Sequence, residues 1–143
     1  NTTTSDVTGN QTIGGTLGVT GNSTLAATSV QSFTTTKQVS VTINSITANP
    51  GGSETLSLDD HFNFISYSGS NGDYTITLPN ADSGAVMRFK TDDSVAANKT
   101  ITLQPQSGQR IDGEATYSMN RSFDGISVVG HNDQWYIIQK KEK

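Results

Sequence analysis

The sequence predicts an all-β fold, in which a short intertwined trimeric β stem is followed by an antiparallel, jelly-roll-like β-sandwich knob. Composition is the first reason: 21 Thr, 17 Ser, 14 Gly and 11 Asn accompany only 31% hydrophobic residues in 143, a mixture that favours strands and turns. Apolar residues at i, i+3, i+4 and i+7 are missing, whereas alternating runs such as "KQVSVTINSI" and "YTITLP" are frequent. The third reason is a regular apolar series near the N-terminus.

That series lies in the first predicted domain, residues 1–36, and indicates an oligomer. Within "VTGNQTIGGTLGVTGNSTLAATSV" an apolar anchor recurs every six residues, at Val7, Ile13, Val19 and Leu25. Six extended residues span about 20 Å, so these anchors cannot pack on one another in one straight chain. Two 12-residue repeats are also too few for a solenoid. Three intertwined copies would bury each anchor against its symmetry mates. The alternative is a disordered Thr-rich linker, against which the regular spacing argues.

The second predicted domain, residues 37–143, is the knob. One strand is expected within residues 34–52. Eight more are expected near residues 54–58, 62–67, 74–78, 86–91, 100–104, 115–118, 125–129 and 135–139. Turn sequences such as "SGSNGD", "PNADSG" and "GHNDQ" separate most of them. Short, closely spaced strands are typical of a sandwich or jelly roll, and Pro79 and Pro105 are expected to end strands.

Charge and cysteine content limit the partners. The net charge is −4, and three of the nine basic residues lie in the terminal "KKEK", so no basic patch for nucleic acid is expected. The absence of Cys excludes disulfides, thiolate zinc sites and cysteine nucleophiles, and fits synthesis in a reducing cytoplasm. No signal peptide and no apolar run of transmembrane length is found, so membrane insertion is not expected. The initial Asn suggests a piece of a longer chain.

Two stretches resemble a known family. "NQTIGGTLGVTGNSTL" resembles the shaft repeats of bacteriophage tail fibres and related trimeric fibres. "YTITLPNADSGAVMRFKTDDSVAANKTITLQPQSGQRIDG", followed by "SVVGHNDQWYII", is similar to the β-rich C-terminal domain at the ends of such fibres. The resemblance implies a homotrimeric tip that follows an upstream shaft and contacts a host or prey surface, at the tip of a virion tail fibre. Similar modules occur in bacterial cell-envelope adhesins, which leaves an extracellular bacterial fibre as the alternative. The autocleaving chaperone of some fibre tips has no counterpart in this sequence.

Catalytic, metal and cofactor sites are not predicted. Cleavage of a polysaccharide would need two carboxyl groups across a groove, but nearly all acidic residues of the knob lie in expected turns, where Asp is common for backbone reasons. No G-x-S-x-G or P-loop motif occurs. His61 and His131 are the only histidines, and neither belongs to a known metal-binding motif, although one histidine per chain on a threefold axis, or calcium at an Asp pair, stays open as an alternative.

Binding of a glycan or an envelope protein by the knob is therefore the predicted function. Sugar sites combine aromatic faces with polar side chains that hydrogen-bond hydroxyl groups. The candidate ligand-binding residues are Tyr67, Asn71, Asp73, Arg121, Phe123, His131, Asn132, Asp133 and Trp135. For Trp135 the alternative is the core or the trimer interface, because Trp135 and Ile137 share one strand face while Tyr136 and Ile138 share the other. The alternative functions are a structural knob that caps and registers the trimer, or a polysaccharide-degrading tip.

Overall fold

The computed structural model describes residues 41–82, 84–96 and 98–141. The chain divides into two units, Asn1–Gln38 and Val39–Lys143, and all described residues belong to the second. The predicted stem, with Val7, Ile13, Val19 and Leu25, and the predicted domain boundary at residues 36 and 37 lie outside the described residues. Both stay predictions.

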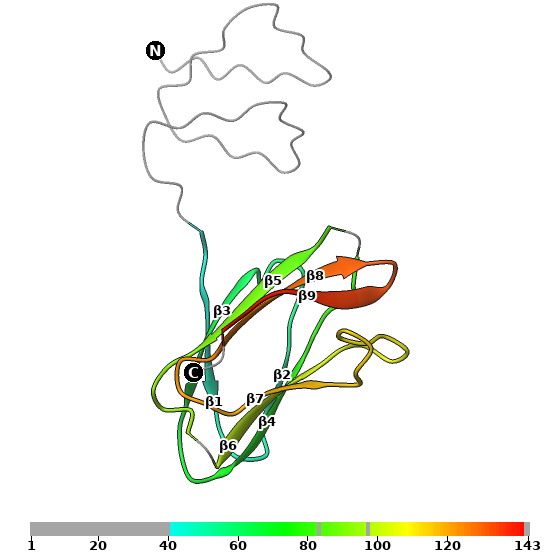
Figure 1. Ribbon diagram of the computed structural model, residues 1–143. Coiled ribbons are helices and arrows are strands. Elements are labelled where there is room, and N and C mark those ends of the chain that lie inside the picture. Colours follow the sequence, from blue (N-terminus) through cyan, green and yellow to red (C-terminus); the bar gives the residue numbers. More distant parts are fainter. Residues whose placement is uncertain (1–40, 83, 97, 142–143) are drawn as a thin grey trace, which may run out of the picture. The chain divides into compact units, whose positions relative to one another are not determined.

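Nine strands and no helix are found among the described residues. The strands form two sheets, which Figure 1 shows as two layers. The first sheet has the order β1-β3-β5-β8-β9, with β1 at Asn44–Ala48, β3 at Phe62–Tyr67, β5 at Val86–Thr91, β8 at Gly125–His131 and β9 at Gln134–Lys141. The second has the order β2-β4-β6-β7, with β2 at Ser53–Thr55, β4 at Gly72–Thr77, β6 at Lys99–Gln104 and β7 at Tyr117–Met119. The predicted all-β class is confirmed for this part of the chain.

Successive strands alternate between the two sheets through β6, and this alternation produces parallel pairing. In the first sheet β1 pairs in parallel with β3, and β3 with β5, while in the second sheet β2 pairs with β4, and β4 with β6. A parallel pair needs a crossover connection, and here the strand in the opposite sheet is that connection. Each pair of successive strands, one in each sheet, makes one coil of the chain. The three coils, β1 with β2, β3 with β4 and β5 with β6, stack on one another. Strands β7, β8 and β9 complete the sheets with antiparallel pairs.

The predicted antiparallel pairing is therefore wrong for β1 to β6, and the jelly-roll comparison is not supported by this order of strands. The positions of β3 and β5 match the prediction to the residue. What the sequence pattern does not contain is the partner of each strand, because a short polar connection can turn back within one sheet or arch across to the other. The prediction that Pro79 and Pro105 follow strand ends is confirmed, since β4 ends at Thr77 and β6 at Gln104.

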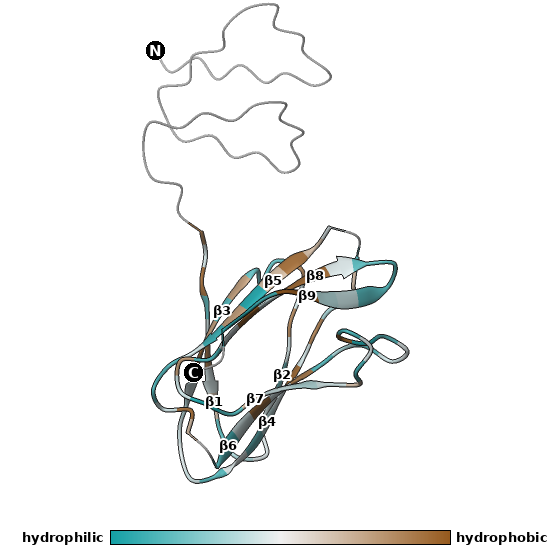
Figure 2. Cartoon of the chain, viewed as in Figure 1, coloured by the Kyte–Doolittle hydropathy of each residue, from teal (hydrophilic) through white to brown (hydrophobic). Residues whose placement is uncertain are grey.

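The hydrophobic core lies between the two sheets. Alternate residues of β3, β4 and β5 point inward, and Figure 2 shows the resulting change between hydrophobic and hydrophilic segments along β5. The fully buried side chains include Ile65 and Met87 from the first sheet and Ile76 and Ile101 from the second. The inner faces of the two sheets thus bury each other's apolar side chains. A functional site must therefore be sought at the ends of the sandwich or on its outer faces.

The two ends of the sandwich can be distinguished by strand direction. Because β1, β3 and β5 are parallel, all three begin at one end, called the near end, where the described chain starts at Val41. They finish at the opposite end, called the far end. At the near end β8 passes so close to the loop after β4 that a Cβ on Gly130 would lie 2.3 Å from the backbone oxygen of Asp82. Only glycine fits this position without a shift of the backbone.

Candidate functional site

Four connections meet at the far end of the sandwich. They are the β1–β2 turn (residues 49–52), the β3–β4 turn (68–71), the β5–β6 loop (92–98, of which 97 is not described) and the β7–β8 loop (120–124). Five of the nine predicted ligand-binding residues lie in these connections or at the strand ends beside them. These five are Tyr67, Asn71, Asp73, Arg121 and Phe123. The far end is therefore where the structure brings most of the predicted site together.

Hydrogen bonds join these connections into one platform. The backbone N–H of Tyr67 donates to Ser94 Oγ at 2.6 Å. The hydroxyl of Ser94 donates in turn to the carboxylate of Asp92, whose backbone oxygen accepts from the N–H of Phe123 at 3.1 Å. In the same region Ser122 Oγ donates to the backbone oxygen of Val95 at 2.8 Å. The loops are thus held by defined bonds, which is the kind of support that positions a binding surface.

Phe123 is the exposed aromatic residue of this platform. Its side chain is 41% exposed, and its backbone has φ of 63°, in the left-handed region that non-glycine residues rarely adopt. The Nζ atom of Lys90 lies 5.6 Å from the centroid of the Phe123 ring and donates to the backbone oxygens of Phe123 and Asp124. Strained backbone of this kind is often found at functional sites, and here the lysine helps to hold it.

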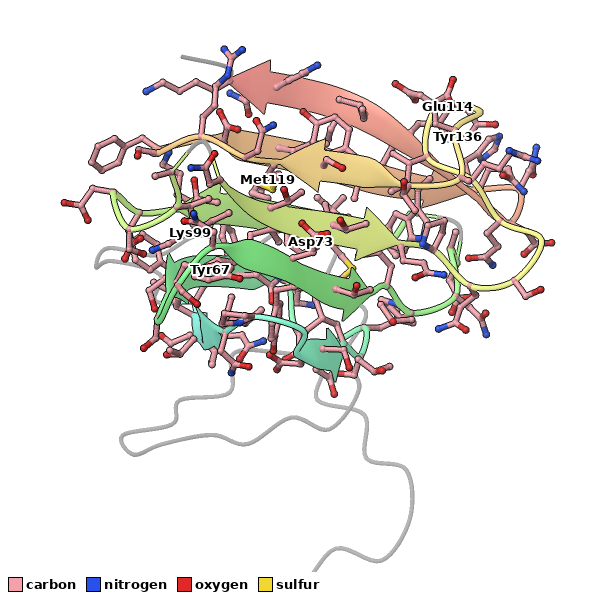
Figure 3. The ribbon with its side chains drawn as sticks, turned by 90° about the horizontal axis from the view of Figure 1, so that it is seen from below. Tyr67, Asp73, Lys99, Glu114, Met119 and Tyr136 are labelled. Carbon is pink, nitrogen blue, oxygen red and sulfur yellow. The ribbon has the colours of Figure 1, made fainter. Side chains whose placement is uncertain are left out.

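Tyr67 is buried, whereas a ligand-binding aromatic residue would be exposed. Burial raises its pKa, with a further contribution from the negative charge of Asp73. The Nζ atom of Lys99 lies 5.0 Å from the centroid of its ring, and Figure 3 shows both residues at the same side of the sandwich. Since the ring is enclosed, Tyr67 supports the far end and does not offer a face to a ligand. Asn71 and Asp73 are exposed and stay candidates.

Three other predicted residues lie at the opposite end. His131 is the last residue of β8, and Asn132 and Asp133 form the near-end turn that joins β8 to β9. Asn132 and Asp133 have φ of 49° and 55°, which is the geometry of a tight two-residue hairpin turn in which Asn and Asp are favoured. Their presence is explained by the turn. The structure does not bring them together with Arg121 and Phe123.

Trp135 lies in the core, with 0% of its side chain exposed. The structure therefore supports the alternative reading of this residue and not its role in ligand binding. The expected alternation along this strand is confirmed from Trp135 to Ile138, since Tyr136 and Ile138 are 42% and 57% exposed on the opposite face. A β-bulge shifts the register of β9 against Ser127 and Val128. Ile137 packs against the core as expected. Ile138 is the extra residue of the bulge, because Val128 pairs with Ile137 and Ser127 with Gln139.

A groove that sequence reasoning missed lies on the outer face of the first sheet. It has a volume of about 350 Å³. Its apolar side is formed by Val41, Ile43, Phe62 and Phe64, and its polar side includes Arg88, Lys90 and Lys141. The available signal was "FNFISY", where two phenylalanines alternate with Asn and Ile. Strict alternation allows either set to face outward, and the local sequence does not decide between them.

Among the described residues, no group of three or more His, Cys, Asp or Glu side chains could hold a metal ion. Asp59 and His61 line a second hollow of about 280 Å³ beside the groove. The Nδ1 atom of His61 lies 3.2 Å from the backbone oxygen of Val86. Asp60, their neighbour, accepts hydrogen bonds from the backbone N–H and hydroxyl of Ser57. These hydrogen bonds hold the loop between β2 and β3 against the surface of the protein.

Comparison with known proteins adds no assignment: no protein-family model matches the chain, and no curated protein matches it. The fold defines a class only, an all-β sandwich of two mixed sheets with a hydrogen-bonded loop platform at one end. No helix in the described part of the chain is long and apolar enough to cross a membrane.

Proposed function

We propose that the chain is the terminal module of a homotrimeric fibre and attaches, without catalysis, to a glycan on a cell surface. The resemblance of its repeats to tail-fibre shafts supports this role, either at the tip of a virion tail fibre or in a bacterial envelope fibre. The observation that carries the proposal is the far-end platform, where Phe123 is exposed on a strained but hydrogen-bonded loop. The platform lies opposite the end where the described chain begins.

The chemistry of the platform suits a sugar. The exposed ring of Phe123 offers an apolar face to the C–H groups of a pyranose. Asn71 and Asp73 are exposed at the same end of the sandwich, and their side chains can accept hydrogen bonds from hydroxyl groups. Arg121 is also exposed in the β7–β8 loop and can donate to hydroxyl or carboxylate oxygens.

Glycan-array binding by the full chain tests this proposal, with Phe123→Ala as the variant. Removal of an aromatic side chain at the centre of a binding site typically costs about 2 kcal/mol or more, so a loss of affinity of about thirtyfold or greater is expected. Tyr136→Ala is the matched control, because Tyr136 is also exposed (42%) but lies on β9. Figure 3 places Tyr136 at the other side of the sandwich from Tyr67 and Lys99.

Each outcome has a distinct meaning. Binding that Phe123→Ala abolishes and Tyr136→Ala preserves supports the platform. A trimer that binds no glycan and no cell surface is a structural cap, and the proposed attachment is then wrong. Release of reducing ends from a bacterial polysaccharide by the full chain would show that the module is an enzyme.

A further inference from the structure

The two outer faces of the sandwich have opposite chemistry. On the second sheet, the register places Ser53 beside Thr75, Thr75 beside Thr102 and Thr102 beside Ser118, so hydroxyl groups cross all four strands. The neighbouring outward positions carry Thr55, Thr77, Thr100, Gln104 and Asp73. An outer face of this kind is typical of a sheet whose exposed side contacts water.

The first sheet departs from this rule at β3. Phe62 and Phe64 point outward, whereas Asn63 points inward and is buried. The side chain of Asn63 is satisfied there: its amide donates to the backbone oxygen of Asp60 at 2.7 Å, and its oxygen accepts from the Asn44 amide at 3.1 Å. The first half of β3 therefore has its polar residue inside and its aromatic residues outside, which is favourable only if something covers the outer face.

Exposed apolar side chains continue from β3 to the start of the described chain. Val41 is 51% exposed, Ile43 is 60% exposed and Phe64 is 44% exposed, and all three line the 350 Å³ groove. Because the sequence of the second sheet shows that this chain can make a fully polar outer face, the apolar groove is a specific feature of the first sheet and is not a general property of the sandwich.

The charge on this face limits what can cover it. Arg88, Lys90 and Lys141 line the groove, and no acidic residue does. Burial lowers the pKa of Lys90, and the positive charge of Lys141 lowers it further. An arrangement that places this face against the same face of a second copy across a twofold axis would bring like charges together, which is unfavourable. The remainder of the chain is acidic, with 13 Asp and Glu against 9 Lys and Arg overall.

We propose that a neighbouring copy of this chain covers the groove, by a head-to-tail contact in which an acidic part of each copy meets the cationic, apolar outer face of the first sheet in the next. A head-to-tail contact closes into a trimeric ring when each copy is rotated by a third of a turn from the last. The occupant is argued from charge complementarity: the groove is lined by three basic residues and no acidic one, in a chain of net charge −4. The trimeric stem of the proposed function would in addition hold the copies at high local concentration. The inference rests on the homotrimer of the proposed function and assigns its contact surface.

Thiol protection in the full chain tests this surface. The sequence contains no Cys, so a single introduced thiol reports on one position. Ile43→Cys and Phe64→Cys place the thiol on the groove, and Ser118→Cys, on the exposed outer face of the second sheet, is the control. If a neighbouring copy covers the groove, alkylation at positions 43 and 64 will be about tenfold or more slower than at position 118, because access limits thiol reactivity, and the difference will vanish in urea.

A second pair of variants separates coverage by a neighbour from coverage within one chain. Adding Phe64→Asp to Ile43→Cys should raise the alkylation rate at position 43 to that of the control, whereas adding Ser118→Asp should leave it slow. Sedimentation on the same samples gives the mass. A trimer in which all three thiols react at the same rate would overturn the assigned surface and leave the trimer intact. A mass near the 15.2 kDa of one chain would overturn the inference and the oligomeric part of the proposed function, while glycan binding would still be decided by the Phe123→Ala experiment.

Discussion

Replacement of Trp135 by Ala distinguishes a core role from a ligand-binding role for the only tryptophan of the chain. The side chain is fully buried, and Trp→Ala changes in cores typically cost about 3–5 kcal/mol through lost burial and the cavity left behind. Since small domains are stable by only about 5–15 kcal/mol, the variant should lose a large share of its stability. For a domain of this size each kcal/mol lowers the melting temperature by roughly 4–8 °C.

Urea unfolding of the full chain, followed by circular dichroism at one fixed protein concentration, measures this loss. The concentration must be fixed because association of copies contributes to the apparent stability. Tyr136→Ala is the control, since it removes an exposed aromatic residue from the same strand. Trp135→Phe should cost much less than Trp135→Ala, because it keeps a ring in the core and removes an indole N–H that is buried without a hydrogen-bond partner. If Trp135→Ala and Tyr136→Ala unfold at the same urea concentration as the parent chain, the assignment of Trp135 to the core is wrong.

Three further predictions concern backbone and charge. Gly130→Ala should destabilise the sandwich by about 1–3 kcal/mol, because the added Cβ would lie 2.3 Å from a backbone oxygen. Gly125→Ala is the control in the same urea assay and should be tolerated, because the nearest atoms to its added Cβ lie at 3.5 Å. Asp133→Gly should raise the melting temperature slightly without changing glycan binding, because glycine adopts the positive φ of this turn without strain; a loss of binding would return the β8–β9 turn to the candidate site. Burial lowers the pKa of Lys90, so in an NMR titration Lys90 should lose its proton at a lower pH than an exposed lysine does. Between those two pH values the unfolded chain binds more protons than the folded chain, so the free energy of unfolding should rise with pH. Titration of Lys90 at the pH of an exposed lysine would contradict this.

The location of strands was predictable from the sequence, but their pairing was not. The run from Phe62 to Tyr67 is bounded by turn residues and alternates regularly, so both its extent and its conformation could be inferred. Its partners in the sheet, β1 and β5, are separated from it by strands of the other sheet, and no local pattern records this. Pairing depends on tertiary packing, which places successive strands in opposite layers.

The candidate site shows the same division. Phe123 could be selected as an aromatic residue in a polar loop, and the structure finds it exposed. The orientation of Phe64 could not be selected, because the hydrogen bonds that allow Asn63 to be buried come from residues far away in the sequence or across a turn. Likewise the bulge at Ile138 depends on the register between β8 and β9, which the local sequence does not record. Alternation predicts which residues share a face, and only long-range contacts decide which face is buried.

The stacked coils also bear on how such a protein could change its target. Adjacent strands keep their register although the spacing between paired residues varies along the chain, from 19 positions between Asn44 and Asn63 to 26 between Phe62 and Arg88. The difference is absorbed by the connections at the two ends. Each coil contributes its own loop to the far end, so the length of one loop can change there without a change in the register of the sheets, and the proposed binding surface can vary one loop at a time.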